Sequence, residues 1–150
     1  MMLDSVSWRY QHYFNSMKRF QLKLTDGFMI NSELIESHVS NLSGISQRNM
    51  GNGYVWYTLP PSEIATETVT VDICFFQSNL ESLKVSIFNP DKYGHGWDDY
   101  SEHKQRLRAE DTKLWLKRLG YDVGKHQWGD IWAGYDLKSG SSFAVIRYIE

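Results

Sequence analysis

The sequence predicts an α+β fold, in which an antiparallel sheet of about five or six strands carries a long helix on one face. Residues 98–119 have the capping residues and apolar spacing of that helix, and residues 126–149 alternate as a β-hairpin does. The alternating apolar runs at 68–75 and 83–87 are typical of an antiparallel strand pair with one buried face. Because no linker or internal repeat interrupts the chain, we expect residues 1–150 to form a single domain.

The first part of the chain is expected to contain two helices and two short strands. Residues 4–19 place apolar side chains at helical spacing, and residues 20–24 then alternate as a half-buried strand does. An Asp-Gly turn signal precedes a second short strand at 28–30. A helix capped by a short polar side chain is then expected over residues 31–42.

The middle of the chain reads as loops and strands. Residues 43–53 hold three glycines and two asparagines and are expected to form a loop, whereas the aromatic residues 54–59 form a strand that two prolines end. The central strand pair turns near Ser78 and Asn79, and residues 89–96 form a second loop. The side chains expected on the buried face of the pair are Val69, Val71, Ile73, Phe75, Leu83, Val85 and Ile87.

The long helix has a clear start and a clear end. Asp98, Asp99 or Ser101 can cap its first turn, and Gly120 suits the position just beyond its last turn. The side chains expected to face the sheet are Leu107, Leu114 and Leu119, with Trp115 beside them. Basic residues interleaved with acidic ones indicate a solvated helix face rather than a phosphate-binding one; they are Lys104, Arg106, Arg108, Lys113, Lys117 and Arg118.

Composition excludes several classes of protein. Hydrophobic residues make up 41% and charged residues 23%, which is ordinary for a folded protein, and a net charge of −2 creates no field that favours nucleic acid. No apolar run approaches the roughly 20 residues that a membrane span needs, and the first residues lack the order of a signal peptide. We therefore expect a cytoplasmic protein with neither a nucleic-acid nor a membrane partner. Cys74 is expected to be a buried, inert thiol.

One cluster has the residue types of a metal or catalytic site. It comprises His95, Asp98, Asp99, Glu102 and His103, in which Asp99 and His103 are four residues apart and would share a helix face. A small metal-binding protein or enzyme built on this cluster is our alternative hypothesis. We favour the simpler interpretation, an acidic helix start beside a solvated histidine, which needs no metal and no cofactor.

Two further sets of residues have side chains of the types found in functional sites. His126 with Asp130 or Asp136 would make a general-base pair, but no nucleophile accompanies them. Arg147 stands among apolar residues of the last strand and needs a partner or a route to water. Asp136, across the hairpin, is its expected partner, and the sharper alternative is an Arg147 that anchors a ligand carboxylate.

The aromatic content of 15% exceeds what a core of this size needs, so some rings are expected at the surface, where they make good contact residues. Acidic side chains beside such rings suit a basic protein partner, because charge speeds the encounter and aromatic area supplies affinity. The expected partner-binding residues are Trp97, Asp98, Asp99, Tyr100, Asp130 and Trp132.

The last 50 or so residues resemble a pattern found in small bacterial proteins. The matching positions are Trp97, Asp98, Asp99, Glu102, Thr112, Trp115, Leu116, Trp128, Gly129, Ile131, Tyr135, Asp136, Lys138, Gly140, Ser141, Ser142, Ile146, Arg147 and Tyr148. Similar proteins include candidate immunity proteins of bacterial toxin systems, such as contact-dependent growth inhibition. The resemblance implies a non-enzymatic cytoplasmic protein that binds a cognate toxin domain and blocks its active site.

Overall fold

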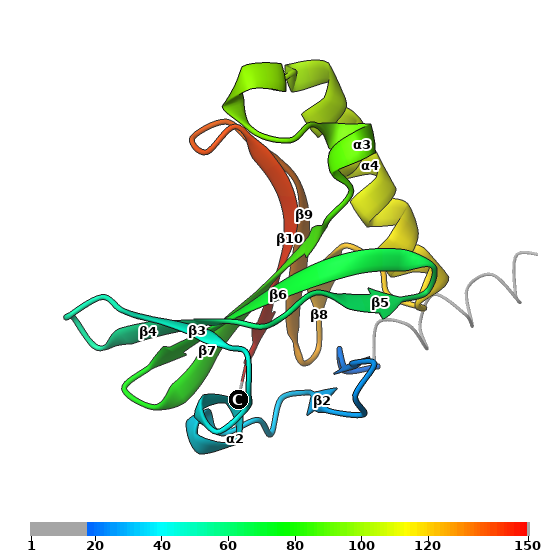
Figure 1. The fold of residues 1–150 in the computed structure, drawn as a ribbon. Coiled ribbons are helices and arrows are strands. Elements are labelled where there is room, and N and C mark those ends of the chain that lie inside the picture. The colour runs from blue at the N-terminus through cyan, green and yellow to red at the C-terminus, as the bar shows by residue number, and fades with distance from the viewer. Residues whose placement is uncertain (1–17, 150) are drawn as a thin grey trace, which may run out of the picture.

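The computed structural model describes residues 18–149, so the helix expected over residues 4–19 lies almost wholly outside the described part of the chain. An antiparallel sheet of eight strands forms the frame, and the longest helix packs across two of its strands (Figure 1). The strands of this sheet are β3 (Ser46–Asn49), β4 (Tyr54–Thr58), β5 (Ser62–Ile64), β6 (Glu67–Phe76), β7 (Asn79–Ile87), β8 (Gly124–His126), β9 (Gly129–Asp136) and β10 (Ser141–Tyr148).

The spatial order of the strands is β3-β4-β6-β7-β10-β9-β8, with β5 pairing alongside the first half of β6. A separate two-stranded sheet joins β1 (Leu22–Lys23) to β2 (Met29–Ile30). The helices are α2 (Glu36–Ser40), α3 (Pro90–Tyr93), the 3-10 helix η1 (Trp97–Asp99) and α4 (Glu102–Arg118). The α+β class, the antiparallel sheet and the long helix on one face are therefore as predicted.

The predicted number of strands, five or six, was too low. β3 falls in the segment predicted to be a loop, and all four of its residues are exposed, so it carries no alternation for sequence reasoning to detect. It forms because its backbone pairs with β4, from Ser46 opposite Thr58 to Asn49 opposite Val55. β5 and β8 have only three residues each, too few to show a period.

The central strand pair is as predicted, with a small shift of its turn. Val69, Val71 and Ile73 on β6 lie opposite Ile87, Val85 and Leu83 on β7, and all six are buried. The turn falls at Gln77 and Ser78, one residue earlier than expected, and both have the positive φ, 48° and 68°, that a tight type I′ hairpin turn requires.

The predicted inner face of the long helix was wrong at two positions. Leu107 is 40% exposed and Leu114 is 56% exposed, whereas Leu119 packs against the core, and Trp115 and Leu116 are fully buried. Ser101, the last of the three predicted caps, accepts a hydrogen bond from the Lys104 N–H, so the helix begins at Glu102, four residues after the predicted start. The side chains that face the sheet are Gln105, Ala109, Thr112, Trp115 and Leu116, which recur at helical spacing.

The helix predicted over residues 31–42 is much shorter. Asn31 accepts a hydrogen bond from the Glu33 N–H at 2.9 Å and so forms a turn instead of a helix cap. Only Glu36–Ser40 is helical, and Val39 is the residue that this helix buries. Among residues 18–149, no helix combines the length and hydropathy that crossing a membrane requires.

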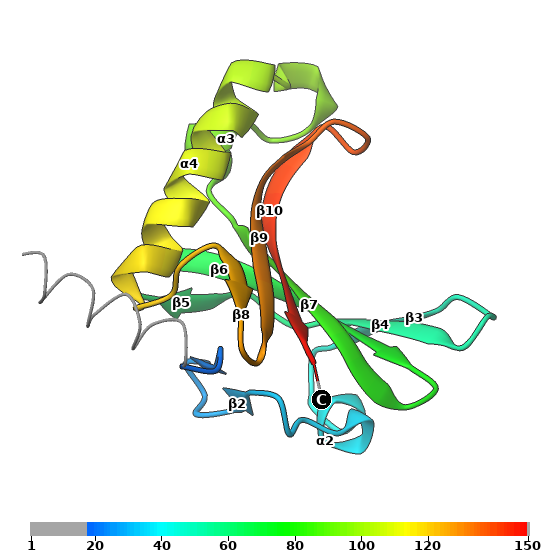
Figure 2. The same cartoon turned by 180° about the vertical axis from the view of Figure 1, so that it is seen from behind.

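The two faces of the sheet differ in what covers them. One row of cross-strand partners is buried throughout and comprises Tyr57, Ile73, Leu83, Ile146 and Ile131. The α4 helix covers one part of this face, and α2 reaches another part, where the Tyr57 hydroxyl donates to the Glu36 carboxylate at 2.7 Å. No described helix lies on the opposite face of the sheet. The β3–β4 hairpin, at one end of the sheet, curves away from α4 (Figure 2).

Candidate functional site

The six residues predicted to bind a partner lie on two sides of β9. Tyr135 faces α4, because the Arg106 guanidinium lies 4.7 Å from its ring centroid. The Tyr100 hydroxyl is 2.8 Å from that of Tyr135, which places the Trp97–Tyr100 segment on the helix side, at the end of the strand. Trp132, an odd number of residues from Tyr135, lies on the opposite side. The sheet therefore separates Asp130 and Trp132 from the other four residues.

We call the uncovered side of the sheet the open face. A second row of cross-strand partners runs across it and comprises Thr58, Asp72, Lys84, Val145 and Trp132. These side chains are partly or fully exposed, unlike the buried row beside them. The same strand registers place five further side chains on the open face, beside this row: Arg48, Trp56, Asp130, Phe143 and Arg147.

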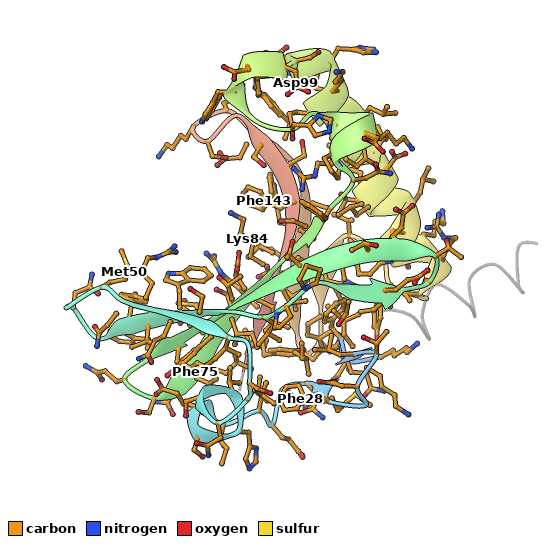
Figure 3. The ribbon with its side chains drawn as sticks, in the orientation of Figure 1. Phe28, Met50, Phe75, Lys84, Asp99 and Phe143 are labelled. Atoms are coloured by element: carbon orange, nitrogen blue, oxygen red, sulfur yellow. The ribbon has the colours of Figure 1, made fainter. Side chains whose placement is uncertain are left out.

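Aromatic rings and charges are in contact on the open face. The Trp132 and Phe143 rings have centroids 5.6 Å apart at an angle of 55°. The Lys84 ammonium lies 4.2 Å from the Phe143 ring centroid, a cation–π contact, and Figure 3 shows both side chains on the side of β10 away from α4. The Asp72 carboxylate accepts a hydrogen bond of 2.6 Å from the Thr58 hydroxyl. The face thus presents a pre-formed surface of rings with fixed charges among them.

The predicted pairing of Arg147 with Asp136 was wrong. The β9–β10 register places Arg147 opposite Asp130 and Asp136 opposite Ser141, at the other end of the hairpin. Arg147 is exposed, so it reaches water and needs no buried counter-ion. Asp136 serves the turn, where its carboxylate accepts a hydrogen bond from the Lys138 N–H at 3.2 Å.

The Trp97–Tyr100 segment borders a pocket of about 290 Å³, which we call the end pocket. The pocket lies between the residues that precede α4, the first turns of α4 and the β9–β10 turn. The residues that line the pocket include Phe88, Tyr93, Trp97, Tyr100, Gln105, Arg108, Ser139 and Ser141. Two motifs some 40 residues apart in the sequence, the Trp-Asp-Asp and the Gly-Ser-Ser segments, therefore meet here.

Asp99 shapes the rim of the end pocket. Its carboxylate accepts hydrogen bonds from the His95 N–H at 2.7 Å and the Gly96 N–H at 3.1 Å, and the His95 ring lies 3.1 Å away. These bonds, first that of the His95 ring, lower the pKa of Asp99 below its usual value. Asp99 therefore caps the loop before α4, and Figure 3 shows it at this end of the molecule.

The cluster proposed as an alternative metal site does not converge in this geometry. His95 contacts Asp99 and, at 3.5 Å, Asp91, while His103 lies exposed on α4. Within residues 18–149, no group of three or more histidine, cysteine or carboxylate side chains is placed to hold a metal ion. The geometry therefore offers no support for the metal-based alternative.

Two other sequence candidates have local structural roles. The His126 Nε2 atom lies 2.6 Å from the Asp122 carbonyl oxygen, and the ring stacks on Trp128, so these contacts orient the ring and do not form the general-base pair with Asp130 or Asp136 that the sequence left possible. Cys74 is 2% exposed, as expected for a buried thiol. Burial, followed by the charge of Glu81, raises its pKa and keeps the thiol protonated at neutral pH.

Sequence reasoning missed the arginine that lines the end pocket. Arg108 was grouped with the solvated basic residues of α4, yet its Nε atom donates to the Ile87 carbonyl oxygen at 2.8 Å and its Nη2 atom donates to the same oxygen. Burial lowers the pKa of its guanidinium. The sequence feature that could have indicated this role is the position of Arg108, three residues after Gln105 and seven before Trp115, on the helix face that packs against the sheet.

Gln105 connects the base of the end pocket to β10. Its side-chain oxygen accepts a hydrogen bond from the Ser142 N–H at 3.3 Å, and its side-chain nitrogen donates to the Tyr93 carbonyl oxygen at 3.3 Å. The Ser142 hydroxyl donates to the backbone oxygen of Gln105. This buried network fixes the start of α4 against the end of the hairpin, so the pocket has a rigid base.

Asp111 holds α3 against α4. Its carboxylate accepts a hydrogen bond of 2.6 Å from the Tyr93 hydroxyl and lies 2.8 Å from the Lys92 ammonium. Burial acts to raise the pKa of Asp111, but the bonds from Lys92 and Tyr93 outweigh it, and the pKa falls below its usual value. A carboxylate of this kind stabilises the fold in its charged form.

We predict that Asp111→Asn lowers the free energy of unfolding by about 2 kcal/mol at pH 7, because two charge-assisted hydrogen bonds are weakened. The stabilisation by the wild-type carboxylate is complete above the unfolded-state pKa of about 3.9 and is lost as pH falls through the lower folded-state value. Urea unfolding at pH 7 and at pH 3 should therefore show a smaller difference at pH 3. Glu110→Gln, whose side chain is 69% exposed, is the control with little effect. An equal loss at both pH values would contradict this account.

Residues 18–149 thus define a small α+β protein in which no described helix covers the open face and the end pocket lies on the other side of the sheet. Searches against protein-family models, curated proteins and solved structures found no match for this chain.

Proposed function

We propose that this protein is a non-enzymatic binder of another protein, and that it docks its partner on the open face. The observation that carries the proposal is a sheet face with no described helix upon it, on which the Trp132 ring is 43% exposed and packs on the largely buried ring of Phe143. Exposed rings on a rigid frame are the usual anchors of protein interfaces, because they add contact area at little cost in conformational entropy.

The frame favours binding with little rearrangement. The row from Thr58 to Trp132 spans five strands that are hydrogen-bonded to one another, so the relative positions of its side chains are fixed before a partner arrives. Pre-organisation of this kind reduces the entropy lost on association. The alternating charges of Asp72, Lys84, Asp130 and Arg147 would then select the orientation of the partner.

The resemblance of the last 50 or so residues to immunity proteins supports a more specific proposal. In it, the partner is a cognate bacterial toxin domain, the complex forms in the cytoplasm, and the bound protein covers the toxin's active site. The net charge of −2 is compatible with a basic toxin surface. Neutralisation would then require no bond to be made or broken, only an interface that excludes the toxin's substrate.

The test uses the toxin encoded next to the gene for this protein. We expect Trp132→Ala to weaken binding by about 30-fold or more, because removal of a central aromatic anchor typically costs 2 kcal/mol or more. Binding would be measured by calorimetry with purified proteins, and growth rescue would report the same loss in cells.

Trp97→Ala is the matched control, because Trp97 is 78% exposed but lies on the helix side of the sheet. It should leave toxin affinity unchanged, and both variants should retain the wild-type circular dichroism spectrum. A loss of affinity with Trp97→Ala alone would refute the open face as the interface. Absence of binding to the adjacent toxin by the wild-type protein would refute the immunity function.

A further inference from the structure

The end pocket contains a half-buried cation without a counter-ion. The Arg108 guanidinium has five N–H donors, of which Nε and one on Nη2 bond to the Ile87 carbonyl oxygen and one on Nη1 makes a long contact of 3.5 Å with the Gln105 side-chain oxygen. These acceptors are neutral. Among the described residues, no carboxylate lies within 4.0 Å of this guanidinium, and the nearby Asp111 is engaged by Tyr93 and Lys92.

An unpaired cation that is partly removed from water is energetically unfavourable and is stabilised by an anion. Burial already lowers the pKa of Arg108, which reports the loss of hydration. Within residues 18–149, two of the five N–H donors have no acceptor, so an anion that enters the pocket can be bound without displacing the bonds to Ile87.

The walls of the pocket indicate what the anion is attached to. Trp97 is 78% exposed and Phe88 is 51% exposed, and the Trp97 and Tyr100 rings contact each other with centroids 5.3 Å apart. These rings border the pocket, while Ser139 and Ser141 add hydroxyl groups on its β9–β10 side. A volume of about 290 Å³ lies at the lower end of the range for small-molecule sites.

The charge of the rim favours a singly charged ligand. Asp91, with a side chain that is 95% exposed, and Asp98 and Asp99 lie on the segment that borders the opening. These carboxylates would repel a doubly charged phosphate more strongly than a single carboxylate, which Arg binds through two parallel hydrogen bonds. The lining therefore combines the Arg108 cation with aromatic rings, with the polar side chains of Gln105, Ser139 and Ser141, and with the His95 ring near an acidic rim.

We propose that the end pocket binds the carboxylate of a small aromatic or apolar acid, with Arg108 as the anion anchor and Trp97 as the apolar wall. Two sources present this chemistry: a free carboxylic acid, or the terminal carboxylate of a peptide chain that ends in an aromatic residue. The pocket lies on the opposite side of the sheet from the open face, so this ligand site does not depend on the proposed partner interface.

The test is a titration of isotopically labelled protein, followed by two-dimensional NMR, with phenylacetate and with its uncharged analogue phenylacetamide. We expect phenylacetate to shift resonances of the end pocket with a Kd on the order of 1 mM, and phenylacetamide to bind at least tenfold more weakly. A second arm compares an acetylated Ala-Ala-Phe peptide with its C-terminal amide. Preference for the acid in the first arm identifies a free small acid as the source, and preference in the second arm identifies a chain terminus.

Variants locate the site. Arg108→Gln should abolish detectable binding of the acid, and Arg108→Lys should restore part of it, since the charge remains but the planar fork is lost. Lys117→Gln removes a charge of the same sign from the exposed side of α4, away from the pocket lining, and should bind as the wild type does. Trp132→Ala, on the open face, should also leave acid binding unchanged, which separates this proposal from the proposed function.

If Arg108→Gln fails to fold, the carboxylate site is tested instead by Trp97→Ala and by the comparison of acid with amide. Trp97→Ala is suitable because Trp97 is exposed and contributes little to the core. Equal binding of acid and amide by the wild-type protein would overturn the proposal. So would the absence of shifts with every carboxylate at a concentration of about 10 mM, tenfold above the expected Kd.

Discussion

Trp115→Ala is expected to lower the free energy of unfolding by about 4 kcal/mol, the largest effect of any single change predicted here. Trp115 is fully buried between α4 and the sheet, so its removal leaves a cavity that the surrounding strands cannot fill without moving. Its indole N–H also donates to the Ile64 carbonyl oxygen at 2.9 Å, and this oxygen would lose its partner. Urea unfolding followed by circular dichroism would measure the loss.

Leu114→Ala provides the matched control, one residue away on the same helix. Leu114 is 56% exposed, so the same kind of truncation should change stability by only about 0.5 kcal/mol. The pair of variants tests the assignment of the buried helix face, because the sequence pattern placed Leu114 against the sheet. Comparable losses in the two variants would show that the α4 face is assigned incorrectly.

Gly129→Ala is expected to have the second-largest effect, a loss of about 3 kcal/mol. A Cβ atom at this position would lie 1.9 Å from the Arg147 carbonyl oxygen and 3.0 Å from the Tyr148 Cα atom of the neighbouring strand. Both contacts are with backbone atoms, which cannot rotate away, so β9 and β10 would have to separate where they pair. Thermal unfolding, together with amide exchange in β10, would detect the change.

Gly134→Ala is the control on the same strand. The three atoms nearest to its added Cβ atom all belong to the Trp132 ring, the first at 3.2 Å, and that side chain is partly exposed and can shift. We expect a loss below about 1 kcal/mol. If Gly129→Ala were as stable as Gly134→Ala, the close approach of β9 to the β10 backbone would be refuted.

Local patterns predicted those elements whose side chains alternate or recur. The β6–β7 pair was predicted correctly because Val69, Val71 and Ile73 face a core while the residues between them do not. The same reasoning correctly predicted a buried Cys74. It failed for β3, in which every side chain is exposed, because such a strand exists through backbone pairing with β4 and leaves no trace in side-chain polarity.

The role of the six candidate partner-binding residues stays a prediction. The expected exposure of the rings is confirmed for Trp97, Tyr100 and Trp132, whereas Asp99 and Asp130 are half-buried. Sequence spacing carries no information on which side of β9 each segment lies, so the division into an open face and an end pocket was not foreseen. The role of Arg108 was missed because Arg106 and Glu110, two residues away on either side, are charged and indicate a solvated face, while its neighbours in space are the Ile87 carbonyl group and Gln105.

The amino-acid order therefore specified the α+β class, the central hairpin and the existence of the long helix, because each depends on interactions within a few residues or on one repeating period. The three-dimensional packing settled how many strands join the sheet, which side of α4 is buried and which charged groups meet. Such choices depend on contacts between distant segments, as when Arg147 pairs across from Asp130 rather than Asp136. The energies of these long-range contacts arise only once the whole sheet has assembled.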